Sequence, residues 1–178
     1  MLPIEVNTVL RAIKTFIKDP EPISQFDEVV PGLNLVDGIV RIHEPLRSPV
    51  RGQNCVAFFY RSFLVIEGGR APAFHKIKEA EVYAPFELEM EGGTIQVVPK
   101  KPGNFEHQDH QELNKKYGKN FQGTEEVVLP GAKVRLRGKV RKTKDNIVLE
   151  MKEIGVLDKQ AVAAGVVGDR KMRKKKKK

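Results

Sequence analysis

Cysteine, tryptophan and long apolar runs are scarce or missing in this chain of 178 residues. Its one cysteine, Cys55, excludes an intramolecular disulfide framework and any zinc cluster built from cysteines. The longest apolar run, residues 161–168, is far shorter than the roughly 20 residues of a membrane-spanning helix, so we expect no transmembrane segment. Charged residues begin at Glu5, which is unlike a secretory signal. Apolar residues still make up 40% of the chain, enough for a folded core.

Basic residues exceed acidic ones, and the excess is concentrated at the C-terminus. The chain has 32 Lys and Arg against 23 Asp and Glu, a formal net charge of +9. Residues 170–178 contribute eight of these cations, among them Arg170, Lys171 and Arg173. The rest of the chain is therefore close to neutral, and most of the net positive charge comes from this C-terminal tail. Such a tail binds anionic lipid, binds nucleic acid, serves as a nuclear address in a eukaryote or only solubilises the protein.

Composition divides the chain into four parts. Residues 1–28 contain an amphipathic helix over residues 4–18, where apolar side chains recur at helical spacing, and then a proline-rich linker. We expect this helix to pack on the protein's own core; the alternative is that it lies in a membrane interface. Residues 29–157 form a β domain, residues 158–169 a weak helix or linker, and residues 170–178 a disordered tail.

The β domain shows the two-residue alternation of strands, interrupted by Gly and Pro. Phe86, Leu88 and Met90 alternate with glutamates, which is typical of a half-buried strand. Residues 133–141 alternate aliphatic with basic side chains in the same way. Residues 106–118 are polar and predict a surface insertion with a short helix. We therefore expect a mainly β (α+β) fold: a small OB-like β-barrel with an N-terminal amphipathic helix and a short helical insertion.

Three short blocks in this domain occur in a recognisable order. The first runs from Asp37 to Arg61, the second begins at Pro85, and the third runs from Gly123 to Val140. The residues that carry the pattern are Gly38, Pro45, Leu46, Ser48, Pro49, Cys55, Tyr60, Arg61, Pro85, Phe86, Glu125, Glu126, Gly131 and Gly138. In this order the blocks resemble the GIDE domain, also called BAM ("beside a membrane"), over roughly residues 36–152.

The resemblance implies a recognition or assembly domain. The family is known from mitochondrial and chloroplast ubiquitin ligases, where the domain lies between two transmembrane helices and a RING finger follows. This chain has neither part, because a RING needs eight Cys or His ligands and only one Cys is present. Ligase activity belongs to the RING, so the resemblance supplies no catalytic residues and no cofactor. We therefore expect that the protein is not an enzyme.

Two groups of residues could still carry chemistry. Cys55 could pair with His43 or His75 as nucleophile and base, but it opens an apolar strand, so we expect a buried and inert thiol. His107 and His110 are weak candidates for a metal site, because their i, i+3 spacing could place both on one helix face. No third ligand is forced by the sequence, and a solvated insertion is the preferred interpretation.

The basic strand suggests a different function. Alternation places a row of cations on one side of the strand, where an OB-like barrel can present them to phosphates, and these are Lys133, Arg135, Arg137, Lys139 and Arg141. Stacking aromatics are missing from the row, and the acidic face of residues 87–91 could pair with it instead.

The main prediction is therefore a non-catalytic protein-interaction or assembly module of GIDE/BAM type with a protein partner. We expect it to be cytoplasmic, with peripheral attachment to an anionic membrane surface as a further expectation. The alternative is an OB-like nucleic-acid-binding protein that uses the basic strand and the lysine tail.

Overall fold

A computed structural model describes residues 21–99, 103–158 and 162–167. The strands are β1 (Gly32–Arg41), β2 (Leu46–Arg47), β3 (Asn54–Cys55), β4 (Ala57–Ile66), β5 (Ala73–Tyr83), β6 (Phe86–Met90), β7 (Gly93–Pro99), β8 (Phe121–Val128), β9 (Lys133–Lys142), β10 (Ile147–Val156) and β11 (Val162–Val167). The helical elements are η2 (Phe26–Glu28), α2 (His107–Tyr117) and η3 (Gly118–Asn120). The mainly β class and the short helical insertion are thus confirmed. The helix predicted over residues 4–18 and the tail 170–178 lie outside the described residues.

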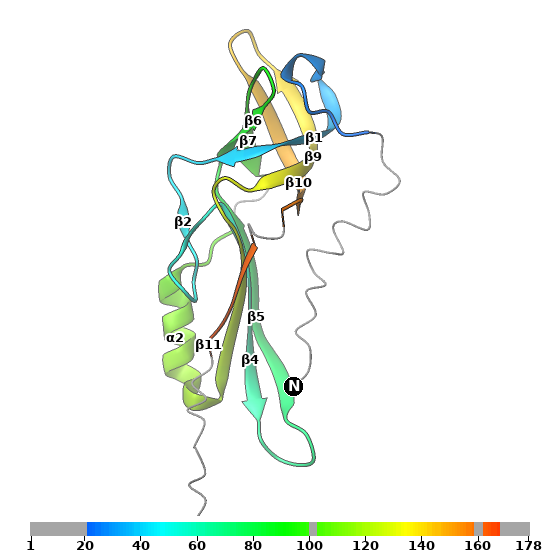
Figure 1. The fold of residues 1–178 in the computed structure, drawn as a ribbon. Coiled ribbons are helices and arrows are strands. Elements are labelled where there is room, and N and C mark those ends of the chain that lie inside the picture. Colours follow the sequence, from blue (N-terminus) through cyan, green and yellow to red (C-terminus); the bar gives the residue numbers. More distant parts are fainter. Residues whose placement is uncertain (1–20, 100–102, 159–161, 168–178) are drawn as a thin grey trace, which may run out of the picture.

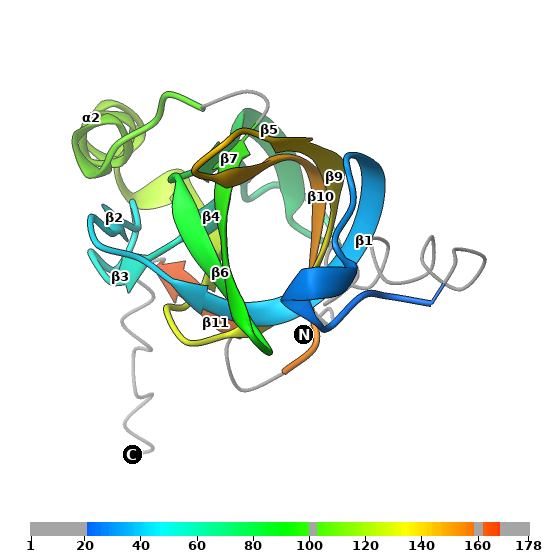
Figure 2. The same cartoon turned by 90° about the horizontal axis from the view of Figure 1, so that it is seen from above.

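Five strands close into a barrel in the order β1-β6-β7-β10-β9 (Figure 2). Neighbouring strands are antiparallel except β7 and β10, which run parallel. Numbered one to five along the chain, these strands have the order 1-2-3-5-4, with the third and fifth parallel. This is the strand order of OB-type barrels, so the OB-like barrel expected from the sequence is present.

The barrel core follows from the alternation along its strands. Val134, Leu136 and Val140 of β9 are buried, as predicted, whereas Lys133 and Lys139 are exposed. β6 likewise buries its three apolar side chains. Two strand glycines allow the strands to approach closely: a Cβ on Gly38 would lie 2.6 Å from the Glu89 carbonyl oxygen, and one on Gly138 would collide with the carbonyl of Glu150.

A second sheet, with the order β11-β8-β4-β5, extends from one end of the barrel (Figure 1). β4 and β5 are inserted between barrel strands β1 and β6, and β8 lies between β7 and β9 in the chain. Their alternation resembles that of the barrel strands, so the sequence suggested one β domain without separating the two sheets. Residues 162–167 correct one prediction: they form strand β11, paired with β8 from Val162–Val128 to Val167–Gly123, in place of a weak helix.

Helix α2 lies against one side of this second sheet (Figures 1 and 2). Its start is stabilised by a capping box, in which the Glu106 side chain accepts from the backbone of Asp109 and the Asp109 carboxylate accepts from the Glu106 N–H. It ends at Gly118, whose φ of 60° suits glycine. The helix places one buried side chain, His110, over the sheet. None of the helices in the described ranges is long and apolar enough to span a bilayer.

Candidate functional site

The second sheet has two unlike faces. Along β4, Phe58 and Tyr60 are buried on the side that carries α2, which we call the covered face. Phe59 and Arg61 alternate with them on the opposite side, which we call the open face. Aromatic rings also pack on the covered face, where the ring of Tyr60 stacks on that of Phe105 with centroids 4.4 Å apart.

A buried carboxylate anchors a loop to the covered face. Glu125 of β8 is 2% exposed and accepts three hydrogen bonds. The donors are the Ser48 hydroxyl at 2.9 Å, the Val50 N–H at 2.7 Å and the Arg51 N–H at 3.1 Å. The Ser48 hydroxyl oxygen also accepts from the Gln53 N–H at 3.1 Å. Because a buried carboxylate is costly unless donors surround it, this arrangement fixes the β2–β3 loop on β8.

Residues from two of the three sequence blocks meet around this carboxylate. Ser48 and Cys55 come from the first block and Glu125 from the third. Burial raises the pKa values of Cys55 and Tyr60, and the charge of nearby Glu125 raises them further. Cys55 and Tyr60 are completely buried. The shared cluster explains why these residue types are needed together: they hold one loop on one strand. Their role is structural.

The Cys55 thiol lacks the surroundings of a nucleophile. It is 0% exposed, as the sequence predicted. Burial, and then the charge of Glu125, raises the pKa of Cys55 to about 12, so the thiol is protonated at neutral pH. Of the two histidines considered as bases, exposed His43 follows β1 and lies 3.4 Å from Glu87, and exposed His75 lies in β5 opposite Leu64. No pairing of Cys55 with either imidazole is seen.

The two helix histidines point to different partners. His110 Nδ1 lies 3.0 Å from the buried Tyr60 hydroxyl, and burial lowers the pKa of His110. His107 Nδ1 lies 2.5 Å from the Pro49 carbonyl oxygen, and its Nε2 lies 2.8 Å from the Gln111 amide nitrogen. Each imidazole thus serves to fix α2 on the sheet or on the β2–β3 loop. Within the described residues no group of three His, Cys, Asp or Glu side chains is placed to hold a metal ion.

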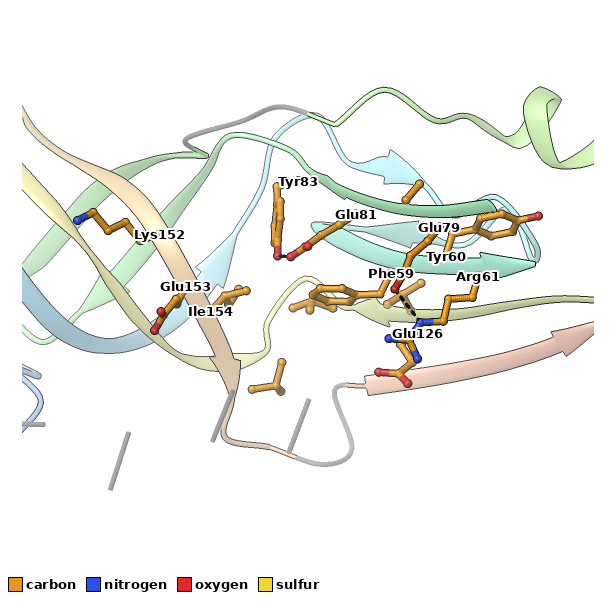
Figure 3. A pocket seen from close by; sticks show the side chains of 14 residues that line it. Phe59, Tyr60, Arg61, Glu79, Glu81, Tyr83, Glu126, Lys152, Glu153 and Ile154 are labelled. Atoms are coloured by element: carbon orange, nitrogen blue, oxygen red, sulfur yellow. Dashed lines mark hydrogen bonds and ion pairs between the residues drawn. The ribbon is translucent and has the colours of Figure 1, made fainter. Parts of the chain in front are cut away.

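The open face borders a cleft of about 590 Å³ between the second sheet and barrel strand β10. Its apolar floor includes Val128 and Ile154, both buried. Phe59 and Tyr83 form an edge-to-face pair with centroids 6.0 Å apart and an interplanar angle of 88°. Figure 3 shows these rings with the acidic side chains of the neighbouring strands. A bulge in β10 at Lys152 shifts the register there and brings Lys152 to the lining.

Carboxylates dominate the polar lining of the cleft. Glu79 is neutralised by Arg61 at 3.1 Å and by Lys76 at 2.8 Å, and its pKa is lowered, mainly by the hydrogen bond from Lys76. Glu81 accepts from the Tyr83 hydroxyl, yet burial and then the nearby Glu79 raise its pKa.

Glu126 is the least satisfied of the cleft carboxylates. Its Oε2 is buried and has no hydrogen-bond partner. Burial raises the pKa of Glu126, and the positive charge of Arg61 only partly opposes this. A buried acceptor without a partner costs free energy, so the cleft would gain by taking a donor or a cation at this oxygen. Phe59, Tyr83 and Glu81 are not identified as site residues from the sequence. Alternation within β4, which separates Phe59 from buried Phe58 and Tyr60, is the signal that was available for Phe59.

Arg135 and Arg141 of the basic strand are paired with carboxylates on neighbouring strands. Arg135 binds Asp37 of β1 through two hydrogen bonds of 2.7 and 2.8 Å, and the Asp37 hydrogen bond raises the pKa of Arg135. Arg141 lies 2.8 Å from Glu150 of β10. Arg137 is half-buried opposite Glu153, while Lys133 and Lys139 are exposed. The alternation was predicted correctly, but β9 does not present an uncompensated row of five cations.

The alternative of ion pairs between the basic strand and the acidic face of β6 is wrong. β1 lies between β6 and β9 in the barrel, so these two strands are never neighbours. Glu89 instead pairs with Arg41 of β1 at 2.5 Å, and Glu87 lies 3.4 Å from His43. The sequence showed two complementary faces, but strand order decides which charges meet.

The other residues of the sequence pattern occupy structural positions. Phe86 is buried in the barrel core, and Gly131 adopts a φ of 83° in the turn before β9. Leu46 packs against the covered-face cluster and Pro49 is buried in the β2–β3 loop, whereas Pro45 and Pro85 are exposed. Tail residues Arg170, Lys171 and Arg173 lie outside the described residues. Comparisons of the chain with protein-family models, with curated proteins and with solved structures find no match.

Proposed function

We propose that the protein is a non-catalytic protein-interaction module of GIDE/BAM type, and that it binds a partner segment by holding a lysine or arginine side chain in the cleft. The single observation that carries this proposal is the buried Glu126 Oε2 without a partner, at the edge of a cleft of about 590 Å³. A space of this size is in the range of ligand-binding pockets.

The chemistry of the lining favours a cation. An aromatic face attracts a positive charge, and Phe59 and Tyr83 supply two rings near Glu81 and Glu126. Apolar residues on the floor suit the aliphatic part of a lysine or arginine side chain. The net charge of the lining is negative, since its four glutamates exceed Arg61 and Lys152.

Binding is a better interpretation than catalysis for this lining. The residues around the cleft include no Ser, Thr, Cys or His, the types that most often act as nucleophile or imidazole base. The GIDE/BAM assignment is supported by the order of the three blocks and by the meeting of Ser48, Cys55 and Glu125 in one cluster.

The geometry gives less support to nucleic-acid binding by the barrel. OB-type barrels bind strands on the face of their second and third strands, which are β6 and β7 here. β6 presents Glu87 and Glu89 on its outer side, and carboxylates repel phosphates. Arg135 and Arg141 of β9 are already paired with carboxylates.

The test is a titration of the full chain with a short peptide followed by NMR. The probe is a blocked peptide with a central lysine, and its matched control carries norleucine, which has the apolar stem without the charge. We expect the lysine peptide alone to shift the signals of Glu81 and Glu126, and Glu126→Gln to weaken its binding severalfold. Glu89→Gln, on the far barrel strand β6, should leave binding unchanged.

The pH dependence offers an independent check. The pKa values of Glu81 and Glu126 are both raised, mainly by burial, and a cation binds only their ionised forms. Binding should therefore fall on acidification at a higher pH than ordinary carboxyl groups would require. Equal binding of the lysine and norleucine peptides, or shifts confined to other surfaces, would refute the proposal.

A further inference from the structure

Three strands of the second sheet place an aromatic ring between two carboxylates on the open face. Phe59 of β4 is the register partner of Glu126 in β8 and of Glu81 in β5. Side chains directly opposite each other on one face of a sheet have Cβ atoms roughly 5 Å apart. Figure 3 shows the Phe59 side chain between those of Tyr83 and Glu126. The ring and both carboxylates therefore border the same part of the cleft.

Phe59 and Tyr83 form a corner of two aromatic faces. Their ring planes make an angle of 88°, with centroids 6.0 Å apart. The Tyr83 hydroxyl donates to the Glu81 carboxylate, which holds the ring in this orientation. Both rings are half-buried and line the cleft, so a ligand can reach the corner. An aromatic face attracts a cation, and methyl groups on a cationic nitrogen carry part of its charge into contact with both faces.

Few hydrogen-bond acceptors in the lining are free. Glu79 already accepts from two cations, and Glu81 accepts from Tyr83. Within the described residues, Glu126 Oε2 is the one buried side-chain acceptor of the lining without a donor. An unmodified lysine ammonium has three N–H donors, and each donor that leaves water without gaining an acceptor costs free energy. One free acceptor therefore suits a cation with one N–H.

We propose that the cation bound in the cleft is a dimethylated lysine side chain of the partner. Its single N–H donates to Glu126 Oε2, its methyl groups contact Phe59 and Tyr83, and its aliphatic stem lies on the apolar floor. A trimethylated lysine lacks the N–H, whereas unmodified lysine and arginine bring more donors than the corner can satisfy. The inference rests on the proposed function, because it names the form of the cation that the cleft takes.

A second pair of rings, farther along β4 and β5, lacks the carboxylates. Phe63 and Phe74 also pack edge to face, with an interplanar angle of 90° and centroids 6.5 Å apart. The register partners of Phe63 are Gln122 and Lys76. Lys76 repels a second cation, and an amide attracts one less than a carboxylate does. This pair is therefore a matched control for the corner in the cleft.

The first experiment measures binding of the full chain to one blocked peptide by isothermal titration calorimetry. Its central lysine is unmodified or carries one, two or three methyl groups. We expect the dimethyl peptide to bind about fivefold or more tighter than the unmodified one, and about threefold or more tighter than the trimethyl one. A neutral analogue, with a CH group in place of the dimethylated N–H, has the same shape and should bind about tenfold or more weakly than the dimethyl peptide.

The outcomes separate this inference from the function on which it rests. No binding of any cationic peptide would refute both. Binding of the unmodified peptide at least as tightly as the dimethyl peptide would overturn the inference and leave the proposed function in place. The inference would equally be overturned if the trimethyl peptide or the neutral analogue bound as tightly as the dimethyl peptide, because neither has the N–H that Glu126 accepts.

The second experiment compares peptides within each variant, so a partial loss of stability does not decide the result. Phe59→Leu removes one face of the corner and should bring the ratio of dimethyl to unmodified binding close to one. Glu126→Ala removes the acceptor and should abolish the preference for dimethyl over trimethyl peptide. Phe74→Leu in the second ring pair and Glu89→Ala on barrel strand β6 should keep both ratios of the parent. Unchanged ratios in the two cleft variants, or equal changes in the two controls, would refute the site.

Discussion

Glu125 and Glu126 are neighbours in β8, and replacing each by alanine should have very different effects. Glu125→Ala removes the acceptor of the Ser48 hydroxyl and of the Val50 and Arg51 N–H groups. A buried donor that loses its acceptor costs roughly 1–3 kcal/mol. Arg51 is exposed, so its N–H can bind water once the carboxylate is gone. Counting mainly the other two donors, we expect a loss of about 3–5 kcal/mol of unfolding free energy.

Glu126→Ala should be almost neutral for stability. Its Oε2 is buried without a partner, so the substitution removes a desolvated acceptor and breaks no hydrogen bond at that atom. We expect the free energy of unfolding to change by no more than about 1 kcal/mol in either direction, because the lost attraction to Arg61 opposes the stabilisation from removing a desolvated acceptor. The two variants delete the same atoms from adjacent positions, so each is the control for the other.

Urea unfolding followed by circular dichroism measures both effects. Glu125→Ala should lower the midpoint strongly at an unchanged denaturant slope, and its Tm should fall by about 10 °C or more. Adding Ser48→Ala should cost little once Glu125 is gone, which a double-mutant cycle would show as a coupling of at least roughly 0.5 kcal/mol. An equal cost for Glu125→Ala and Glu126→Ala, or additive effects of Ser48→Ala and Glu125→Ala, would refute the assignment of Glu125 as the loop anchor.

Two further predictions follow from the buried groups of the covered face. The pKa of Cys55 is raised to about 12 by burial, so alkylation of the native protein at pH 8 should be slower than in urea by on the order of a hundredfold or more; rapid native labelling would contradict this. The pKa of His110 is lowered, mainly by burial, so the unfolded chain takes up the proton first and stability should fall as the pH drops below about 6.5. His110→Phe should be less stable at neutral pH but lack this slope, and an unchanged slope in that variant would contradict the assignment.

The sequence by itself determined which side of an alternating strand such as β6 or β9 is buried. Alternation is a property of consecutive residues, because neighbouring side chains in a strand point to opposite sides. It was therefore enough to predict that Val134, Leu136 and Val140 face inward, and that β6 buries every second residue. The same local pattern predicted the burial of Cys55 at the start of an apolar stretch.

The tertiary structure decided which strands are neighbours, and with them the site. Closure of the barrel depends on the parallel pairing of β7 with β10, in which Gln96 faces Val148, and no local pattern specifies such a distant partner. Strand order likewise places Arg135 of β9 beside Asp37 of β1, to which it donates a hydrogen bond. The stretch 162–167 has no strong preference of its own, and it is a strand because the edge of β8 offers hydrogen bonds to it. The adjacent glutamates Glu125 and Glu126 of β8 look alike in the sequence. Packing on the two faces of the sheet makes Glu125 the anchor of a loop and leaves Glu126 in a cleft. Only the tertiary structure decides this, because the residues that bury each carboxylate or donate hydrogen bonds to it are distant in the chain.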